Sequence, residues 1–194
     1  MLVVAVEHLL EALAVQGALG LIRGRLAGTL GGGQVILGGR GMRYIRQELA
    51  PPVTPGFHNE TIKSAVRYFE AARLPTIVRV PSKEYHHIAR AADMGAEGIM
   101  LPMVNDAKEA KGILNCLKYA PLGQRGVALG VAHDAYRGGP VLEKLAAANA
   151  RTTFFAQIET KAGVKNADDI AAVEGVDCLW VGHFDLSAAL GIPG

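Results

Sequence analysis

The chain has 194 residues, of which half are apolar, a fifth are charged and only 6% are aromatic, and its formal net charge is +2. Its length favours one domain with a sizeable core, and the small charge without a Lys/Arg run gives no support for a nucleic-acid or membrane-surface partner. No apolar stretch reaches the roughly 18 residues that span a bilayer, and the apolar N-terminus lacks a basic start, so we expect a cytoplasmic protein without a signal peptide.

The first 58 residues show little periodicity. A glycine-flanked run over residues 31–39 is interpreted as a turn leading into a strand, and residues 51–56 are rich in Pro and Gly. We therefore expect residues 1–58 to form a divergent or shortened N-terminal part of the fold.

From about residue 59 the pattern is regular. Apolar residues recur at helical spacing over residues 60–72, with Asn59 as the expected helix cap, and short apolar runs ended by Pro or Gly predict buried strands. In chain order, we predict a helix over 60–72, a strand over 76–80, a helix over 82–94, a strand over 98–104, a helix over 105–116 capped by Asn105, strands over 126–131 and 154–158, a helix over 161–172 and a strand over 177–182.

This alternation of strands and helices predicts a parallel sheet covered by helices, because strands buried on both faces read as continuous apolar runs. Both a (β/α)8 barrel and a doubly wound sheet fit the pattern, and the pattern favours the barrel. Either architecture places its chemistry at the carboxyl ends of the strands. Polar residues lie at the carboxyl ends of several predicted strands, namely Arg79, Gln157 with Glu159, and His183 with Asp185.

Glu159 and Asp185 follow two successive predicted strands, so their carboxylates are expected to lie over neighbouring strands. Hard divalent cations take one or two carboxylates and keep open positions for water and substrate. The pair therefore predicts a metal site. The alternative is that Glu159 caps the following helix and Asp185 begins the next one, since acids are common at helix N-termini.

Three further residues are expected near these acids. Arg79 lies within an apolar strand, where a guanidinium needs an anion, and its planar fork suits a carboxylate. Gln157 shares a strand face with Glu159 and can hydrogen-bond a keto or carboxylate oxygen, while Gly182 allows close approach of a ligand. The alternative for Arg79 is a structural ion pair with Glu60 or Asp93.

Two other positions are weaker candidates. His133 and Asp134 could lie near the mouth of a barrel. Asp93 ends a predicted helix, where an acid opposes the helix dipole, and this hints at a role elsewhere.

From about Glu60 to Gly194 the chain resembles the metal-dependent pyruvate aldolases of the HpcH/HpaI family. Several ordered motifs with the expected spacing make the resemblance specific. They are IVRVP at 77–81, DMGAEGIMLPMV at 93–104, YAPLGQRG at 119–126, QIET at 157–160 and GHFDLSAALG at 182–191. The resemblance implies a (β/α)8 barrel over residues 59–194 that cleaves 4-hydroxy-2-oxo acids or 2-keto-3-deoxy sugar acids in aromatic-compound or carbohydrate-acid catabolism.

The resemblance also implies roles for single residues. Glu159 and Asp185 would hold Mg²⁺, Mn²⁺ or Co²⁺, Arg79 and Gln157 would hold the 2-oxo acid, and the backbone at Gly182, Phe184 and Asp185 would bind its carboxylate. The remaining implication concerns Asp93, which matches an acid that reaches the active site of a neighbouring subunit. A homo-oligomer, commonly a hexamer, is thereby implied.

The chain departs from the family pattern at two places. The Asp-x-Glu-His motif that supplies the family's acid/base histidine is absent at the usual interval before Arg79, which falls on Thr54, and His58 lies four residues later. The chain ends at Gly194, so a barrel truncated before its final β/α unit is expected. Two alternatives to the aldolase stay open, namely a lyase of the citrate-lyase or malyl-CoA type and a catalytically impaired remnant that binds metal and 2-oxo acid.

Overall fold

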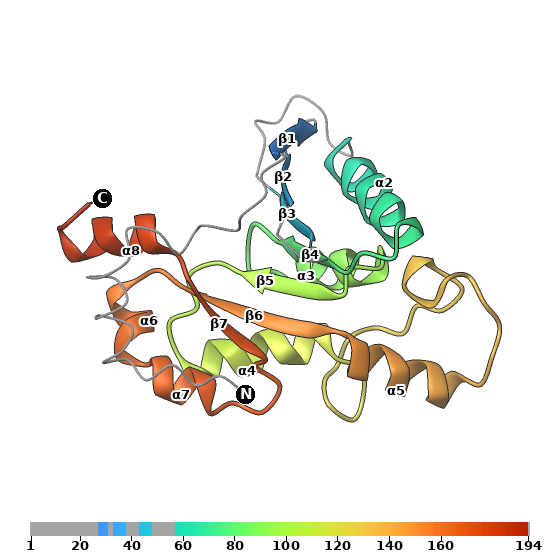
Figure 1. The fold of residues 1–194 in the computed structure, drawn as a ribbon. Helices are drawn as coiled ribbons and strands as arrows, with labels where there is room; N and C mark the ends of the chain where they lie inside the picture. Colours follow the sequence, from blue (N-terminus) through green and yellow to red (C-terminus); the bar gives the residue numbers. More distant parts are fainter. Residues whose placement is uncertain (1–26, 31–32, 38–42, 48–56, 194) are drawn as a thin grey trace.

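The computed structural model describes residues 27–30, 33–37, 43–47 and 57–193, with side chains from residue 62 onward. The described strands form one seven-stranded sheet in which each strand is hydrogen-bonded to the next along the chain (Figure 1). They are β1 Ala27–Leu30, β2 Gly33–Leu37, β3 Arg43–Gln47, β4 Thr76–Arg79, β5 Gly98–Leu101, β6 Thr153–Ile158 and β7 Cys178–Val181.

The predicted parallel sheet is confirmed from β3 to β7, where every neighbouring pair is parallel. The first three strands differ, because β1 and β2, and then β2 and β3, pair antiparallel. The sequential order lacks the reversal that defines a doubly wound sheet, so the parallel part has the strand order of a barrel. The predicted turn and strand at 31–39 correspond to β2, although residues 31–32 and 38–39 lie outside the described part.

Helices follow the parallel strands and bury one face of the sheet. They are α2 Phe57–Ala71, α3 Tyr85–Asp93, α4 Ala107–Leu117, the 3-10 turn η1 Ala132–Asp134, α5 Val141–Arg151, α6 Lys161–Lys165, α7 Ala167–Ala171 and α8 His183–Leu190. None of the helices in the described residues is both long enough and apolar enough to cross a membrane.

The two faces of the parallel strands differ: one packs against the helices, and the other carries the polar residues of the sheet. Alternate residues such as Val78, Ile99 and Phe154 are fully buried in one apolar cluster with the helices. The residues between them point to the opposite face, because side chains alternate along a strand. On that face the register aligns Arg79 with Met100 and, two strands away, Gln157 with Trp180. The polar residues of the sheet are thus held over a rigid, fully packed layer.

Four sequence predictions about these elements are corrected. Asn59 is not a cap, because α2 already begins at Phe57. Asp106, not Asn105, caps α4 by accepting from the amide of Glu109 at 2.8 Å. The predicted helix over 161–172 is two short helices separated at Asn166, whose side chain donates to the carbonyl of Asn105 at 2.8 Å.

The fourth correction is the predicted strand over 126–131, which is an irregular loop. The amide of Gly126 donates to the Tyr85 hydroxyl rather than to a strand, and Gly130 has a positive φ of 72°. Helix α5, which follows this loop, was not predicted. Its only strong signals are Pro140 before its first turn and the alanines within it.

Candidate active site

The polar residues predicted to share a site gather at the carboxyl edge of the parallel strands. Arg79 is the last residue of β4, Glu159 directly follows β6, and Gly182 lies between β7 and α8. Because parallel strands end at the same edge, these positions converge although they are far apart in the sequence. In Figure 1 this edge lies where β6 and β7 lead into α6 and α8.

Arg79 and Gln157 form a direct pair across the intervening strand. The Nε atom of Arg79 donates to Oε1 of Gln157 at 2.9 Å. Since an arginine N–H can only donate, the amide oxygen of Gln157 faces Arg79 and its NH₂ group faces the other way. That group points toward Gly182, where an added Cβ would lie 2.9 Å from it. A hydrogen-bond donor is therefore directed at the gap next to Gly182.

Glu159 is buried, with only 2% of its surface exposed. Its Oε1 accepts from the amide of Met103 at 2.9 Å and lies 4.0 Å from the Arg79 guanidinium. Its Oε2 is buried without a hydrogen-bond partner. The alternative interpretation, that Glu159 caps the following helix, is wrong, because Thr160 caps α6 by accepting from the amide of Gly163.

The charge of Glu159 is not balanced by these contacts. Burial raises the pKa of Glu159 most, and the nearby carboxyl of Asp185 raises it further, against the lowering effect of the Met103 amide and Arg79. Asp185 lies in the first turn of α8 and is exposed. Gly182 lies so close to Glu159 that an added Cβ would stand 2.6 Å from its Oε2. A cation between the two carboxyl groups would remove this imbalance.

The residues present fit a hard divalent cation. Among the described residues no group of three or more His, Cys, Asp or Glu side chains converges. Two carboxylates without soft ligands suit Mg²⁺-like ions, which keep several positions for water and substrate oxygens, better than a structural zinc. The unpartnered oxygen of Glu159 and the absence of a side chain at Gly182 leave room for such an ion.

The remaining predicted residues lie apart from this cluster or at its rim. Phe184 lies in the first turn of α8, and its side chain is 71% exposed. The first amides of a helix have no partner within the helix, so the backbone here retains donors for an anion.

Asp93 is not brought to the cluster within one chain. It ends α3, at the opposite edge from Arg79, since the next residues of the chain lead to the start of β5, where the Glu97 amide donates to the carbonyl of Thr76 at the start of β4. There its carboxylate forms an ion pair with the buried Arg125, whose guanidinium also covers the ring of Tyr119 at 4.4 Å. Arg79 therefore does not pair with Asp93, and the side chain of Glu60 lies outside the described part.

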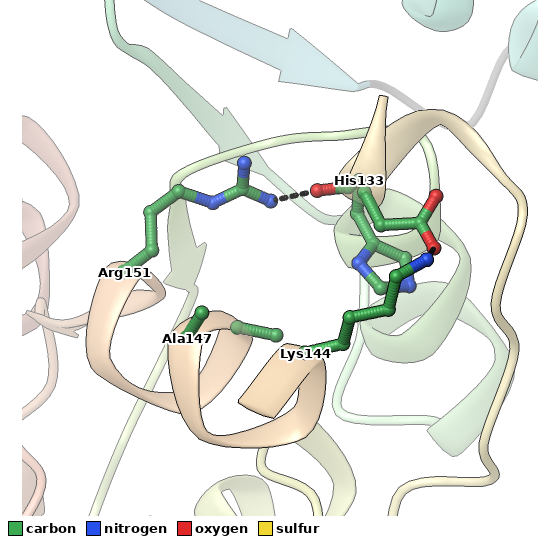
Figure 2. A pocket seen from close by; sticks show the side chains of 6 residues that line it. His133, Lys144, Ala147 and Arg151 are labelled. Carbon is green, nitrogen blue, oxygen red and sulfur yellow. Dashed lines mark hydrogen bonds and ion pairs between the residues drawn. The ribbon is translucent and has the colours of Figure 1, made fainter. Parts of the chain in front are cut away.

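His133 and Asp134 do not lie at the carboxyl edge as expected. They line a cavity of about 210 Å³ between η1 and α5, together with Lys144, Ala147, Ala148 and Arg151 (Figure 2). The Arg151 guanidinium donates to the carbonyl of His133 at 2.7 Å, just before β6 begins. This cavity is thus at the amino edge of the sheet, and Asp134 is neutralised there by Lys144 at 2.7 Å.

Sequence analysis missed one group of the site, the Met103 amide, and, at the opposite edge, Arg125, the partner of Asp93. Met103 acts through its backbone amide, which no side-chain pattern can indicate, although it has an unusual positive φ of 52°. Arg125 lies in a loop that was predicted to lead into a strand, and only its position in an otherwise apolar packing region marks it.

Fold and site together define an α/β protein with a polar cluster at the carboxyl edge of a parallel sheet, where enzymes of this architecture bind their substrates. A family model described as HpcH/HpaI aldolase/citrate lyase matches residues 59–194. The chain belongs to this family.

Known proteins similar to the chain agree with this assignment. It is 44% identical over 115 residues to a 5-keto-4-deoxy-D-glucarate aldolase of Shigella boydii, covering 59% of this chain and 44% of that one. It is 40% identical over 148 residues to a 4-hydroxy-2-oxovalerate aldolase of Novosphingobium aromaticivorans, covering 76% and 53%. An HpcH/HpaI aldolase structure from Desulfitobacterium hafniense matches with a TM-score of 0.72 and 33% identity, covering 80% and 58%. The chain spans about half the length of the curated relatives it matches.

Proposed function

We propose that the chain carries the metal- and oxo-acid-binding part of an aldehyde-lyase, a class II pyruvate aldolase. Its substrate would be a 4-hydroxy-2-oxo acid or a 2-keto-3-deoxy sugar acid, cleaved to pyruvate and an aldehyde. The observation that supports this most is the buried Oε2 of Glu159, to which no protein group donates a hydrogen bond, together with a second carboxyl group, that of Asp185, close enough to raise the pKa of Glu159. The names of the similar aldolases support the reaction and the substrate class.

In this proposal Glu159 and Asp185 hold Mg²⁺, Mn²⁺ or Co²⁺. The bound ion would supply Lewis-acid stabilisation of the negative charge that develops on the keto oxygen when the carbon–carbon bond breaks. Met103 contributes by fixing Glu159, because its amide engages Oε1 and leaves Oε2, which would hold the ion, without a protein partner. The buried position of Glu159 keeps this ligand rigid.

Arg79 and Gln157 would hold the oxo acid. Gln157 is fixed by Arg79, and its NH₂ group can donate to a keto or carboxylate oxygen beside Gly182. Arg79 has terminal amino groups that can donate to the same anion, and its positive charge would stabilise the negative charge that forms in the transition state. The amides of Phe184 and Asp185, at the start of α8, would bind the substrate carboxylate.

Several features of the whole protein belong to the same proposal. The parallel strands would be part of a (β/α)8 barrel, with residues 1–58 as a divergent N-terminal part and 59–194 as the barrel core. The protein would be a cytoplasmic homo-oligomer, a hexamer by analogy with the family, in which Asp93 contributes to the active site of a neighbouring subunit. The exposed third of the Asp93 carboxyl, beside its pair with Arg125, is compatible with that role.

A second candidate is a lyase of the citrate-lyase or malyl-CoA type, which the description of the matching family model includes. A catalytically impaired remnant is the third, since the family's Asp-x-Glu-His motif is absent and Thr54, on which the usual interval before Arg79 falls, lies outside the described residues. His58 lies in α2, and its side chain is likewise outside them.

The test is pyruvate release from a 4-hydroxy-2-oxo acid by the purified chain with Mn²⁺, with Glu159→Ala and Asp185→Ala as matched variants. Release that needs Mn²⁺ and both acids supports the aldolase. Release of acetyl-CoA from a CoA thioester substrate, without pyruvate release from the 4-hydroxy-2-oxo acid, supports the second candidate. Binding of Mn²⁺ and oxalate without any release supports the remnant, and no metal binding at all excludes the proposed site.

A further inference from the structure

We propose that Lys83 is a positioning residue for the metal ligand Glu159, acting through the peptide backbone of Met103. This inference rests on the proposed function. Lys83 lies in the loop between β4 and α3, and Met103 lies in the loop between β5 and α4, so the two belong to successive loops at the carboxyl edge. Neither side chain touches Glu159 directly in the contacts of the described residues.

The first step is the conformation of Met103. Its φ of 52° is in the left-handed region, which residues other than Gly adopt only where surrounding contacts compensate. Its side chain is 52% exposed, so apolar packing does not hold it there. This conformation turns the Met103 amide toward Oε1 of Glu159, at 2.9 Å.

The second step is the contact that holds this peptide. The Nζ atom of Lys83 donates to the carbonyl of Met103 at 2.7 Å. The same residue therefore has its amide bound to Glu159 and its carbonyl bound to Lys83. The neighbouring Val104 amide donates to the Gln157 carbonyl at 3.1 Å, which fixes the other side of the loop.

The third step is what holds Lys83. Its Nζ lies 2.5 Å from Oε2 of Glu109, in the first turn of α4, and the same oxygen accepts from the Asn105 amide at 2.9 Å. Burial would raise the pKa of Glu109, but the hydrogen bonds from Lys83 and the Asn105 amide lower it overall, so this carboxylate stays charged. Glu109 thereby holds the Lys83 side chain at the Met103 carbonyl. The contacts connect Glu109, Lys83, Met103 and Glu159 in that order.

The ordinary role for a partly exposed Lys–Glu pair is a surface ion pair that contributes little to stability. The additional bond to a carbonyl in a strained conformation distinguishes this pair. Groups that orient metal ligands affect metal affinity by about 10- to 100-fold when removed. We therefore expect Lys83 to affect the site more than the exposed lysines of α4 do.

The experiment compares Lys83→Met, Lys83→Arg and Lys111→Met in the full chain. Lys111 is an exposed lysine of α4 and serves as the matched control. Two quantities are measured: the Mn²⁺ dissociation constant, from free Mn²⁺ in electron paramagnetic resonance, and the hydrogen-exchange rate of the Met103 amide in metal-free protein. Melting temperatures confirm that each variant is folded.

We expect Lys83→Met to raise the Mn²⁺ dissociation constant about tenfold and to speed exchange at Met103, because the strained peptide loses its partner. Lys83→Arg should restore both values, since a guanidinium can still donate to a carbonyl and a carboxylate, and Lys111→Met should change neither. Unchanged Met103 exchange in Lys83→Met overturns the proposal, even if Mn²⁺ affinity falls.

Unchanged Mn²⁺ affinity in Lys83→Met, in a chain that otherwise binds Mn²⁺, also overturns it. If the unmodified chain binds no Mn²⁺, the proposed function fails separately. The exchange rates then decide on their own whether Lys83 fixes Met103.

Discussion

Arg79 and Gln157 are joined by a 2.9 Å hydrogen bond that crosses β5, so two side chains from β4 and β6 behave as one polar unit. The bond uses Nε of Arg79 and leaves its two terminal amino groups for other anions. One of these amino groups already lies 4.0 Å from the carboxylate of Glu159. It also fixes which end of the Gln157 amide is the donor. The unit is thus preorganised for an anion with several oxygens, such as a 2-oxo acid.

Replacing Arg79 should separate oxo-acid binding from metal binding. We expect Arg79→Met to weaken binding of oxalate to the Mn²⁺-loaded chain by at least about tenfold, because a charged hydrogen-bond donor is lost. The affinity for Mn²⁺ alone should stay the same or rise, since Arg79 repels the cation. Calorimetric titration of both ligands measures the difference, with Arg90→Met, at an exposed position of α3, as the control. Equal oxalate affinity in the two variants would contradict the role of Arg79.

Replacing Glu159 should remove the metal effect while relieving a cost in the metal-free chain. The pKa of Glu159 is raised by burial and by Asp185, so its ionised form destabilises the fold at neutral pH, and this penalty disappears below the unfolded pKa of about 4.3. Glu159→Gln should therefore melt at the same or a higher temperature than the unmodified chain without metal at pH 7. It should show no rise with Mn²⁺.

The exposed Glu174→Gln is the matched control and should keep the full Mn²⁺ shift. Thermal melts at pH 7 and pH 5, with EDTA or Mn²⁺, make the comparison. A large loss of stability in metal-free Glu159→Gln would mean that the charge of Glu159 is balanced by its surroundings without an ion.

A single methyl group at Gly182 should damage the site. An added Cβ would lie 2.6 Å from Oε2 and 2.8 Å from Cβ of Glu159, and neither a strand-end side chain nor the packed backbone can move freely. We expect Gly182→Ala to lose binding of Mn²⁺ and oxalate together. The matched control is Gly112→Ala in α4, where nothing lies within 4 Å, and it should raise stability by about 0.5 to 1 kcal/mol. Normal Mn²⁺ binding in Gly182→Ala would show that the ion does not lie beside this glycine.

The parallel half of the fold could be predicted because its strands are short apolar runs separated by helices of the right length. The same reasoning failed for residues 126–131, which are apolar and glycine-rich like a strand but have no neighbouring strand with a free edge to pair with. An apolar composition indicates that a segment can be buried, but it does not show which hydrogen-bond partners the backbone of the segment has. The antiparallel pairing of β1 to β3 was not predicted for a related reason, since short, polar-interrupted strands carry weak patterns.

The site residues at strand ends were predictable because topology alone brings Arg79, Gln157, Glu159 and Gly182 to one edge. What the sequence could not indicate was the contact of Glu159 with a backbone amide, or the partner of Asp93. Both depend on loop conformations, and the left-handed turn at Met103 has no residue signature, because Met is not a residue that favours positive φ. Side-chain identity thus predicted which side chains gather at this edge but not the groups that hold them.

The pair between Asp134 and Lys144 gives a pH-dependent prediction away from the site. Burial would raise the pKa of Asp134, but hydrogen bonds from Lys144 and the Gly130 amide outweigh it and lower the pKa to about 2. A lowered pKa means that the carboxylate stabilises the fold above its unfolded pKa of about 3.9, and that this contribution is lost as the pH falls toward 2.

Asp134→Asn should therefore reduce the free energy of unfolding by about 1 kcal/mol at pH 7, through loss of charged hydrogen bonds that join the loop before α5 to that helix. The difference from the unmodified chain should be the same at pH 7 and pH 5 and should shrink between pH 4 and pH 2. Urea unfolding followed by circular dichroism across this range measures it, with Glu174→Gln as the control. A difference that stays constant down to pH 2.5 would mean that the pair contributes through shape and not through charge. If the charge of Asp134 contributed, its protonation at low pH would make the aspartic acid behave like the neutral asparagine, and the difference would shrink.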